Sequence, residues 1–362
     1  MIHCGVGDIG RRLLLALMLV PGLPPLHGEE AAASGTAVIR PKVITEPVPH
    51  DSDDPAIWIN PADPLKSLVL GTDKNTDGGL FAFGLDGKIV KRVGGLKRPN
   101  NVDVLSGFQL GGKQVDIAVL TEREMQRLRV FLLPDLTPLD RGDLVVFDGD
   151  AERAPMGIAL YQRPRDHASF AIVGGKSGPK DGYLWQYRLK DDGQGQVKMS
   201  LARKFGSFTG EKEIESIAVD SAAGSVFYSD ETYGVREYAA DPDAPDAAVE
   251  RSVTGRDGFT KDREGISIYP TGNRSGYLLV SDQAANSFRI FRREIGDGSH
   301  AFLKSVQVVA TDSDGSDVTA VPLGPDFPKG LFVAMSADRT YHFYSWEDIA
   351  GAGLSLSPDN GP

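Results

Sequence analysis

The sequence of 362 residues predicts an all-β fold in which four-stranded antiparallel blades repeat around a central axis. Short β-rich runs separated by turn clusters follow one another along the chain, which holds 42 glycines and 23 prolines. These runs fall into groups of roughly 50 residues, a length typical of one propeller blade. Helical periodicity is confined to one turn around Trp346–Ala350. The pattern disfavours a helical bundle and an alternating α/β fold.

The first hairpin illustrates how the strands are recognised. Apolar residues alternate in Gly79–Gly84 and in Lys88–Val93, on either side of Asp86-Gly87, a pair that tolerates the positive φ of a tight turn. Strand–turn–strand units of this kind recur along the chain. In chain order, the other runs expected to form strands are Ser67–Leu70, Val115–Leu120, Leu128–Leu133, Leu144–Phe147, Ser169–Val173, Tyr183–Leu189, Ser225–Ser229, Val235–Tyr238, Gly276–Ser281, Ser287–Arg292, Ala301–Val309 and Gly330–Ala334.

Acidic residues stand at the start of several apolar runs. The stretches Glu215–Val219 and Glu264–Ile268 both read Glu-x-Ile-x-Val/Ile, and Asp53-Asp54 and Asn101–Asp103 are weaker echoes. Equivalent positions of inner strands converge at one channel mouth in a propeller. Carboxylates crowded there need cations to remain ionised, and calcium accepts such oxygen ligands. Each acid taken alone is explained equally well as a loop cap, so the expectation of calcium depends on the repeated placement.

Charge and motifs exclude several classes of function. The net charge of −11 disfavours nucleic acid and anionic membranes as partners. No histidine pair has zinc-ligand spacing, and Gly174–Gly178 lacks the spacing of a phosphate-binding P-loop. Asp312–Asp317 resembles part of a calcium loop but lacks the downstream glutamate of an EF-hand. An anionic substrate would therefore need local cations at strand ends, such as Lys74, Arg123 and Lys176, which are otherwise ordinary surface charges.

The N-terminus predicts export. Arg11-Arg12, the apolar run Leu13–Val20 and the following prolines are typical of a signal peptide, with cleavage expected near Gly28. The single cysteine, Cys4, would be removed with it, so the exported chain would have no disulfide and no thiolate site. We expect a signal peptide at 1–28, a flexible segment at 29–36, one propeller domain at 37–352 and a tail at 353–362. The destination is the periplasm or the medium.

The ordered motifs resemble the β-propeller phytases, which are calcium-dependent phosphatases that hydrolyse myo-inositol hexakisphosphate (phytate). The resemblance extends from about Val43 to Ile349. The segments that carry it are Asp53–Trp58, Asn100–Asp103, Val115–Ala118, Gly174–Lys176, Glu215 with Ala218 and Asp220, Asp262–Gly265, Gly276–Gln283, and Gly324-Pro325 through Gly330–Ala334.

The resemblance implies a six-bladed propeller, several calcium ions and attack on phosphate by a calcium-bound water. It implies a monomer with phytate or calcium-phytate as its partner. The residues expected to act in catalysis are Glu215, Asp262, Glu264, Lys74, Arg123 and Lys176. Lys74, Arg123, Lys176 and Asn101 are expected to bind substrate. The expected metal ligands are Asp54, Asp103, Glu215, Glu231, Asp262, Glu264, Gln283, Asp312 and Asp314.

Two departures and three alternatives accompany this interpretation. Met156 stands where the family usually has a tyrosine, and the acidic stretch around Thr311–Asp317 is shorter than the family's. A broader phosphatase, a calcium-dependent lactonase and a non-catalytic, calcium-stabilised binding propeller are the alternatives. A lactonase would use one central metal and little basic charge, so Lys74, Arg123 and Lys176 argue against it.

Overall fold

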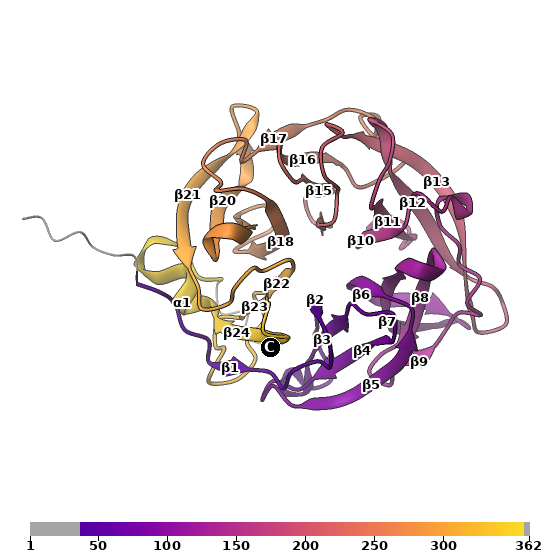
Figure 1. Cartoon of the computed structure of the whole chain (residues 1–362), viewed down its shortest axis with the longest axis horizontal. Coiled ribbons are helices and arrows are strands. Elements are labelled where there is room, and N and C mark those ends of the chain that lie inside the picture. The colour runs from indigo at the N-terminus through magenta and orange to yellow at the C-terminus, as the bar shows by residue number, and fades with distance from the viewer. Residues whose placement is uncertain (1–36, 358–362) are drawn as a thin grey trace, which may run out of the picture. The chain divides into compact units, whose positions relative to one another are not determined.

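The computed structural model describes residues 37–357 and confirms the all-β prediction. Six four-stranded antiparallel sheets follow one another around a central channel (Figure 1). The expected signal peptide, the segment 29–36 and the end of the expected tail, 358–362, lie outside the described residues. Each sheet is one blade, and its first strand in the order below is the innermost.

The first three blades are consecutive along the chain. Blade one holds β2 (Ser52–Trp58), β3 (Leu68–Asp73), β4 (Gly78–Phe83) and β5 (Ile89–Leu96). Blade two holds β6 (Pro99–Leu110), β7 (Lys113–Glu122), β8 (Arg127–Leu132) and β9 (Thr137–Pro138). Blade three holds β10 (Pro155–Gln162), β11 (Ser169–Gly175), β12 (Asp181–Asp191) and β13 (Val197–Ser207).

Two further blades follow, and the last one joins both ends of the described chain. Blade four holds β14 (Ile217–Asp220), β15 (Ser225–Asp230), β16 (Gly234–Ala239) and β17 (Ser252–Thr254). Blade five holds β18 (Arg263–Pro270), β19 (Gly276–Asp282), β20 (Ser287–Gly296) and β21 (Ser299–Gln307). Blade six holds β22 (Ser316–Thr319), β23 (Leu331–Ser336), β24 (Thr340–Ser345) and the early strand β1 (Val43–Ile44).

Helical segments are short. The predicted turn at Trp346–Ala350 is confirmed as α1, and 3-10 turns lie at Pro64–Lys66, Arg123–Met125, Phe147–Gly149, Gln283–Ala285 and Gly351–Gly353. The strand expected at Leu144–Phe147 is wrong. Only Val145 forms an isolated bridge there, because Phe147 and Asp148 adopt positive φ of 54° and 55° and turn the chain out of an extended conformation.

The ring is closed by pairing between its first and last strands. In β1 and β24, Val43 lies opposite Phe343 and Ile44 opposite His342. The Tyr341 hydroxyl donates to the carbonyl oxygen of Thr72 in blade one at 2.8 Å. Blade six is therefore completed by an N-terminal strand and fastened to blade one, so the sheets leave no open gap in the ring.

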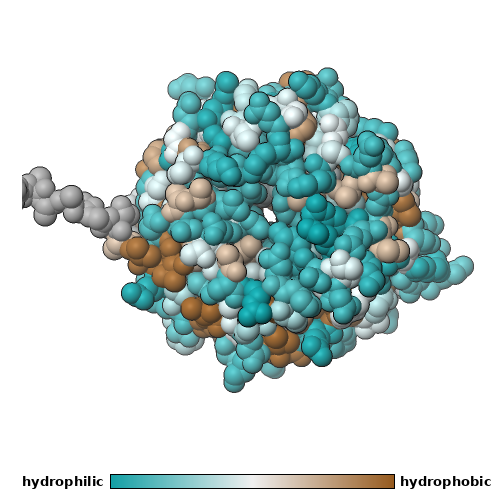
Figure 2. Space-filling model, viewed as in Figure 1, coloured by the Kyte–Doolittle hydropathy of each residue, from teal (hydrophilic) through white to brown (hydrophobic). Residues whose placement is uncertain are grey.

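The hydrophobic core lies between neighbouring blades. Strand alternation places apolar side chains on the faces where two blades meet, and each of the six interfaces has its own cluster. Between blades five and six, for example, Phe288 packs edge-on against Phe332 with ring centroids 4.8 Å apart. Each fully buried ring of this kind contributes about 1.5–3 kcal/mol. Polar residues, by contrast, surround the central opening on the face shown in Figure 2.

Candidate active site at the channel mouth

Carboxylates from blades four and five gather at one end of the inner strands. Carboxylate oxygens of Glu213, Glu215 and Glu231 lie within 4.8 Å of one another, and so do those of Glu231, Asp262 and Glu264. Glu213 and Glu215 precede β14, Glu231 follows β15, and Asp262 and Glu264 lie at the start of β18. Glu231 thus joins two acidic groups, and the convergence expected from the repeated acidic positions is present.

Three oxygens of the second group have no partner in the protein. Glu231 Oε1, Asp262 Oδ1 and Glu264 Oε2 are buried and accept no hydrogen bond. Leaving a buried polar atom unpaired costs about 1–3 kcal/mol, and more for a charged group. Oxygens are the ligands that calcium prefers. The residues present therefore fit a bound calcium ion, which would supply the missing partner.

The raised pKa values of these carboxyl groups also indicate that the cluster needs a bound cation. Burial, with the charges of Glu231 and Glu215, raises the pKa of Glu264 well above its ordinary value. Burial and nearby Glu213 raise the pKa of Glu231 to about 8, despite the opposing effect of Lys212. Without a cation these groups resist ionisation, and a divalent ion would lower their pKa values again.

A partly buried lysine organises the blade-one side of the mouth. Lys74 Nζ lies 2.9 Å from Asp53 Oδ1 and 3.1 Å from Asp314 Oδ2. Gln283 Nε2 donates to the other Asp314 oxygen at 2.5 Å. Burial lowers the pKa of Lys74, but Asp53, Glu215 and Asp314 raise it by more, so the ammonium is retained. The structure therefore brings Lys74, Gln283 and Asp314 together, with Asp53 as an added partner, while their roles in binding metal and substrate stay predictions.

Asn100 connects this lysine network to the acidic groups. Its side-chain amide nitrogen, fully buried, donates to Asp53 Oδ2 at 2.7 Å and to Glu215 Oε1 at 2.6 Å. Its carbonyl oxygen accepts from Arg123 at 3.2 Å. Burial, with nearby Arg98, lowers the pKa of Arg123. The single amide therefore aligns an acid from each side of the mouth and one predicted substrate-binding cation.

Two lysines form ion pairs over the acidic groups, Lys176 from the end of β11 and Lys212 from the loop before β14. Lys176 pairs with Glu213. Lys212 Nζ lies 2.5 Å from Asp262 Oδ2 and 3.3 Å from Glu231 Oε2. Lys176 was predicted from the sequence, whereas Lys212 and Glu213 were not. The alternation Glu211-Lys212-Glu213-Ile214-Glu215 was the available signal, because the acids surrounding Glu215 recur every second residue.

A glycine allows blade three to approach this loop closely. A Cβ atom on Gly157 would lie 1.8 Å from the carbonyl oxygen of Glu215, so no other residue fits there without moving the backbone. Met156, beside it, is buried, and its carbonyl oxygen accepts from the Thr121 hydroxyl at 2.6 Å. The main chain at Met156–Gly157 thus supports Glu215, whereas the Met156 side chain offers no phosphate hydrogen bond.

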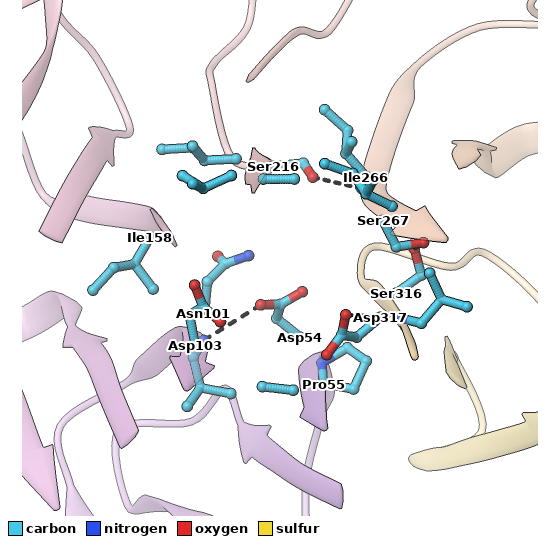
Figure 3. A pocket seen from close by; sticks show the side chains of 17 residues that line it. Asp54, Pro55, Asn101, Asp103, Ile158, Ser216, Ile266, Ser267, Ser316 and Asp317 are labelled. Carbon is cyan, nitrogen blue, oxygen red and sulfur yellow. Dashed lines mark hydrogen bonds between the residues drawn. The ribbon is translucent and has the colours of Figure 1, made fainter. Parts of the chain in front are cut away.

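Other expected ligands lie inside the channel. Asp54, Asp103 and Asp317 line a cavity of about 220 Å³ together with Asn101 (Figure 3). Asp103 accepts from the backbone N–H groups of Val104 and Leu160, each at 2.6 Å. Burial raises the pKa of Asp103 to about 7 and that of Asp317 to about 6. Asp54 and Asp103 therefore form a channel group outside the two acidic groups at the mouth.

Asp312 lies outside both the acidic groups at the mouth and the channel group of Asp54 and Asp103. It is exposed, its backbone N–H donates to Asn286 at 2.9 Å, and it adopts a positive φ of 45°. Asp314, two residues later, contacts Lys74 and Gln283 instead. The role of Asp312 as a ligand stays a prediction.

Comparison with known proteins gives the family. The phytase family matches residues 12–352. A 3-phytase of Bacillus subtilis (strain 168) is 29% identical over 325 residues, covering 83% of this chain and 80% of that protein. Among solved structures, the COPII outer coat vertex on membranes gives a TM-score of 0.47 at 13% identity, covering 85% of this chain and 73% of that chain, which adds nothing to the fold described above. Because the family match spans nearly all of the propeller, this chain belongs to the phytase family.

Proposed function

We propose that this protein is a calcium-dependent phosphomonoesterase that hydrolyses phytate to lower inositol phosphates and phosphate. The family match and the 3-phytase relative support phytate as the substrate. Calcium dependence is supported by the buried, unpartnered oxygens of Glu231, Asp262 and Glu264. They belong to the same channel mouth as Lys74 and its partners Asp53 and Asp314.

The cations of the mouth bind the substrate. Phytate carries many negative charges, and the acidic protein would repel it without local positive charge. Lys74 is held by Asp53 and Asp314, and Arg123 is oriented by Asn100, so both present fixed donors to phosphate oxygens. Lys176 would exchange its Glu213 partner for a phosphate oxygen. Asn101 lines the channel cavity and accepts a hydrogen bond from Asn100 at 3.0 Å, and it is proposed as a further substrate contact.

Hydrolysis requires charge stabilisation and a proton acceptor. When bound, calcium ions would neutralise phosphate oxygens and lower the pKa of water. Lys74 and Arg123 would stabilise the negative charge that develops on the phosphoryl group during attack by water. The attacking water must lose a proton, and the carboxylates around Glu215 supply the bases at this site. The bond from phosphorus to the inositol oxygen then breaks, the inositol oxygen takes up a proton to become a hydroxyl group, and phosphate is released.

The deciding experiment measures phosphate release from phytate near neutral pH. The purified protein is assayed with calcium, after chelation and after calcium is restored, alongside a simple phosphomonoester. We expect release that requires calcium and prefers phytate. Equal rates on both substrates would favour a broader phosphatase. A folded protein that binds calcium but releases no phosphate would favour a lactonase or a non-catalytic binding propeller.

A matched pair of variants tests the site. Glu264→Gln removes one ligand charge and should lower the rate by about 10²-fold or more. Lys113→Gln changes an exposed lysine at the start of β7 and should leave the rate unchanged. Equal activity of both variants would contradict the placement of the site.

Export as a monomer completes the proposal. The signal-peptide pattern at 1–28 supports periplasmic or extracellular action. Within residues 37–357, no helix is long and apolar enough to cross a membrane. Detection of the cleaved chain outside the cytoplasm, and its mass in solution, test these two points.

A further inference from the structure

Lys212 lies across the acidic cluster formed by Glu231, Asp262 and Glu264. Its side chain is 41% exposed, whereas those of Asp262 and Glu231 are 2% and 1% exposed. The ammonium group therefore approaches the buried carboxylates from the solvent side. Lys261 also approaches Asp262 Oδ2, at 3.4 Å, but it is 68% exposed and contacts only that carboxylate of the cluster.

The loop that carries Lys212 is held on both sides. Thr209 donates through its N–H and hydroxyl to Asp230, at 3.0 and 2.7 Å. Ile214 is fully buried in the core between blades three and four. Between these anchors Lys212 adopts a φ of +58°, a conformation uncommon for a residue with a side chain. The backbone therefore fixes the origin of the side chain next to the cluster.

Lys212 and a metal ion would use different oxygens of the same carboxylates. The ammonium contacts Asp262 Oδ2 and Glu231 Oε2. The opposite oxygens, Asp262 Oδ1 and Glu231 Oε1, are unpartnered and buried, as is Glu264 Oε2. The lysine thus neutralises part of the cluster's charge and leaves one oxygen of each carboxylate available.

We propose that Lys212 is a built-in counter-ion that stabilises the calcium-free cluster and weakens its affinity for calcium. This inference rests on the proposed binding of calcium by Glu231, Asp262 and Glu264. Three carboxylates confined in a buried space repel one another, and one ammonium group offsets part of that repulsion. The same positive charge repels a divalent ion that enters the cluster. Lys212 therefore sets the calcium concentration above which this part of the site is filled.

The role predicts effects of opposite sign on two forms of the protein. Without Lys212, the calcium-free protein loses a counter-ion and becomes less stable. The calcium-loaded protein loses a repulsive contact, and the ion binds more tightly. A lysine that served only to hold the loop would stabilise both forms, so its removal would lower both melting temperatures.

The experiment compares Lys212→Gln, the charge-preserving Lys212→Arg and the control Lys261→Gln with the wild-type protein. Calcium chloride is titrated by calorimetry into full-length protein stripped with a chelator, and melting temperatures are recorded with and without calcium. We expect Lys212→Gln to bind calcium about tenfold more tightly at low ionic strength, with the difference shrinking at high salt. We expect its melting temperature to fall without calcium and its calcium-induced rise to exceed that of the wild type. Lys212→Arg and Lys261→Gln should stay within about threefold of the wild-type affinity.

Two results would overturn the counter-ion role. One is a calcium affinity of Lys212→Gln equal to or weaker than that of the wild type. The other is tightening of equal size in Lys261→Gln, which would indicate a general effect of net charge. Neither measurement uses phytate. A wild-type protein that binds calcium but releases no phosphate would contradict the proposed function, and the calcium titration would still decide the role of Lys212.

Discussion

Replacement of Asn100 by alanine tests the connection between the two sides of the mouth. The change removes the donor to Asp53 Oδ2 and Glu215 Oε1, both in a buried setting. Each oxygen left unpaired costs about 1–3 kcal/mol, so the free energy of unfolding should fall by about 2–6 kcal/mol. With an unfolding entropy of about 2.1 cal/mol/K per residue, a domain of this size loses roughly 1.5 °C per kcal/mol. The expected drop in melting temperature is therefore about 3–9 °C.

The assay is thermal unfolding at pH 7.5 with excess calcium, followed by phosphate release from phytate. Arg123 loses the carbonyl that orients it, so kcat/KM should fall by about tenfold as well. Asn100→Asp adds a third anion between Asp53 and Glu215, and it should be less stable than the alanine variant when calcium is removed. Asn273→Ala, at an exposed loop position, is the control. An alanine variant within about 1 °C of the wild type and with unchanged kcat/KM would refute the reasoning.

Three further predictions follow from the fold and the site. A raised carboxyl pKa means that ionisation destabilises the calcium-free fold, so the stability of that fold should fall as pH rises from about 4.5 to about 8, the raised pKa of Glu231. The calcium-induced rise in melting temperature should therefore be larger at pH 8 than at pH 5, and a larger rise at pH 5 would contradict this pH dependence. Thr45→Pro removes the N–H and the hydroxyl that contact the Tyr341 backbone at 3.0 and 2.9 Å, so it should lower the stability by about 2–4 kcal/mol in denaturant unfolding, whereas Thr45→Ser should behave like the wild type. Lys74→Ala leaves Asp53 and Asp314 without their shared cation, so it should both raise the KM for phytate and lower the melting temperature. A change in KM without a change in melting temperature would mean that the lysine is not needed to balance the charges of these acids.

The repeated local pattern was sufficient to predict a propeller of four-stranded blades, whereas the number of blades came from the family resemblance. Alternating apolar residues around Asp86-Gly87 define a hairpin, and the register of β4 and β5 agrees with it. The expectation failed at Leu144–Phe147, where the apolar run is continuous but the backbone turns at Phe147. A single run of four apolar residues contains no information on φ, so the sequence could not distinguish a bridge from a strand.

The site was predictable where an acid precedes an inner strand. Glu215 and Glu264 share this position, and both lie in the acidic groups at the mouth. Asn100 acts through partners far along the chain, Asp53 and Glu215, and no spacing rule connects it to them. Lys212 and Glu213 were indicated only by the alternation of acids that leads up to Glu215. Asp54 and Asp103 carry the same acidic signature, yet they line the channel cavity. Counted from the residue at which pairing resumes after the register shift of each inner strand, they stand one and three residues further along than Glu264, and an odd offset turns a side chain to the other face of a strand.

The closure of the ring by β1 couples the mouth to strands from both ends of the described chain. Blade six, which supplies Asp314 at its inner edge, has its outer strand from the beginning of the chain and its other three from the end. Synthesis therefore delivers β1 long before the other strands of this blade, and Asp314 can meet Lys74 only after the five preceding blades have been made. A chain that ended before β24 would therefore leave β1 without its partner strand, and the hydrogen bond from Tyr341 to blade one would be missing.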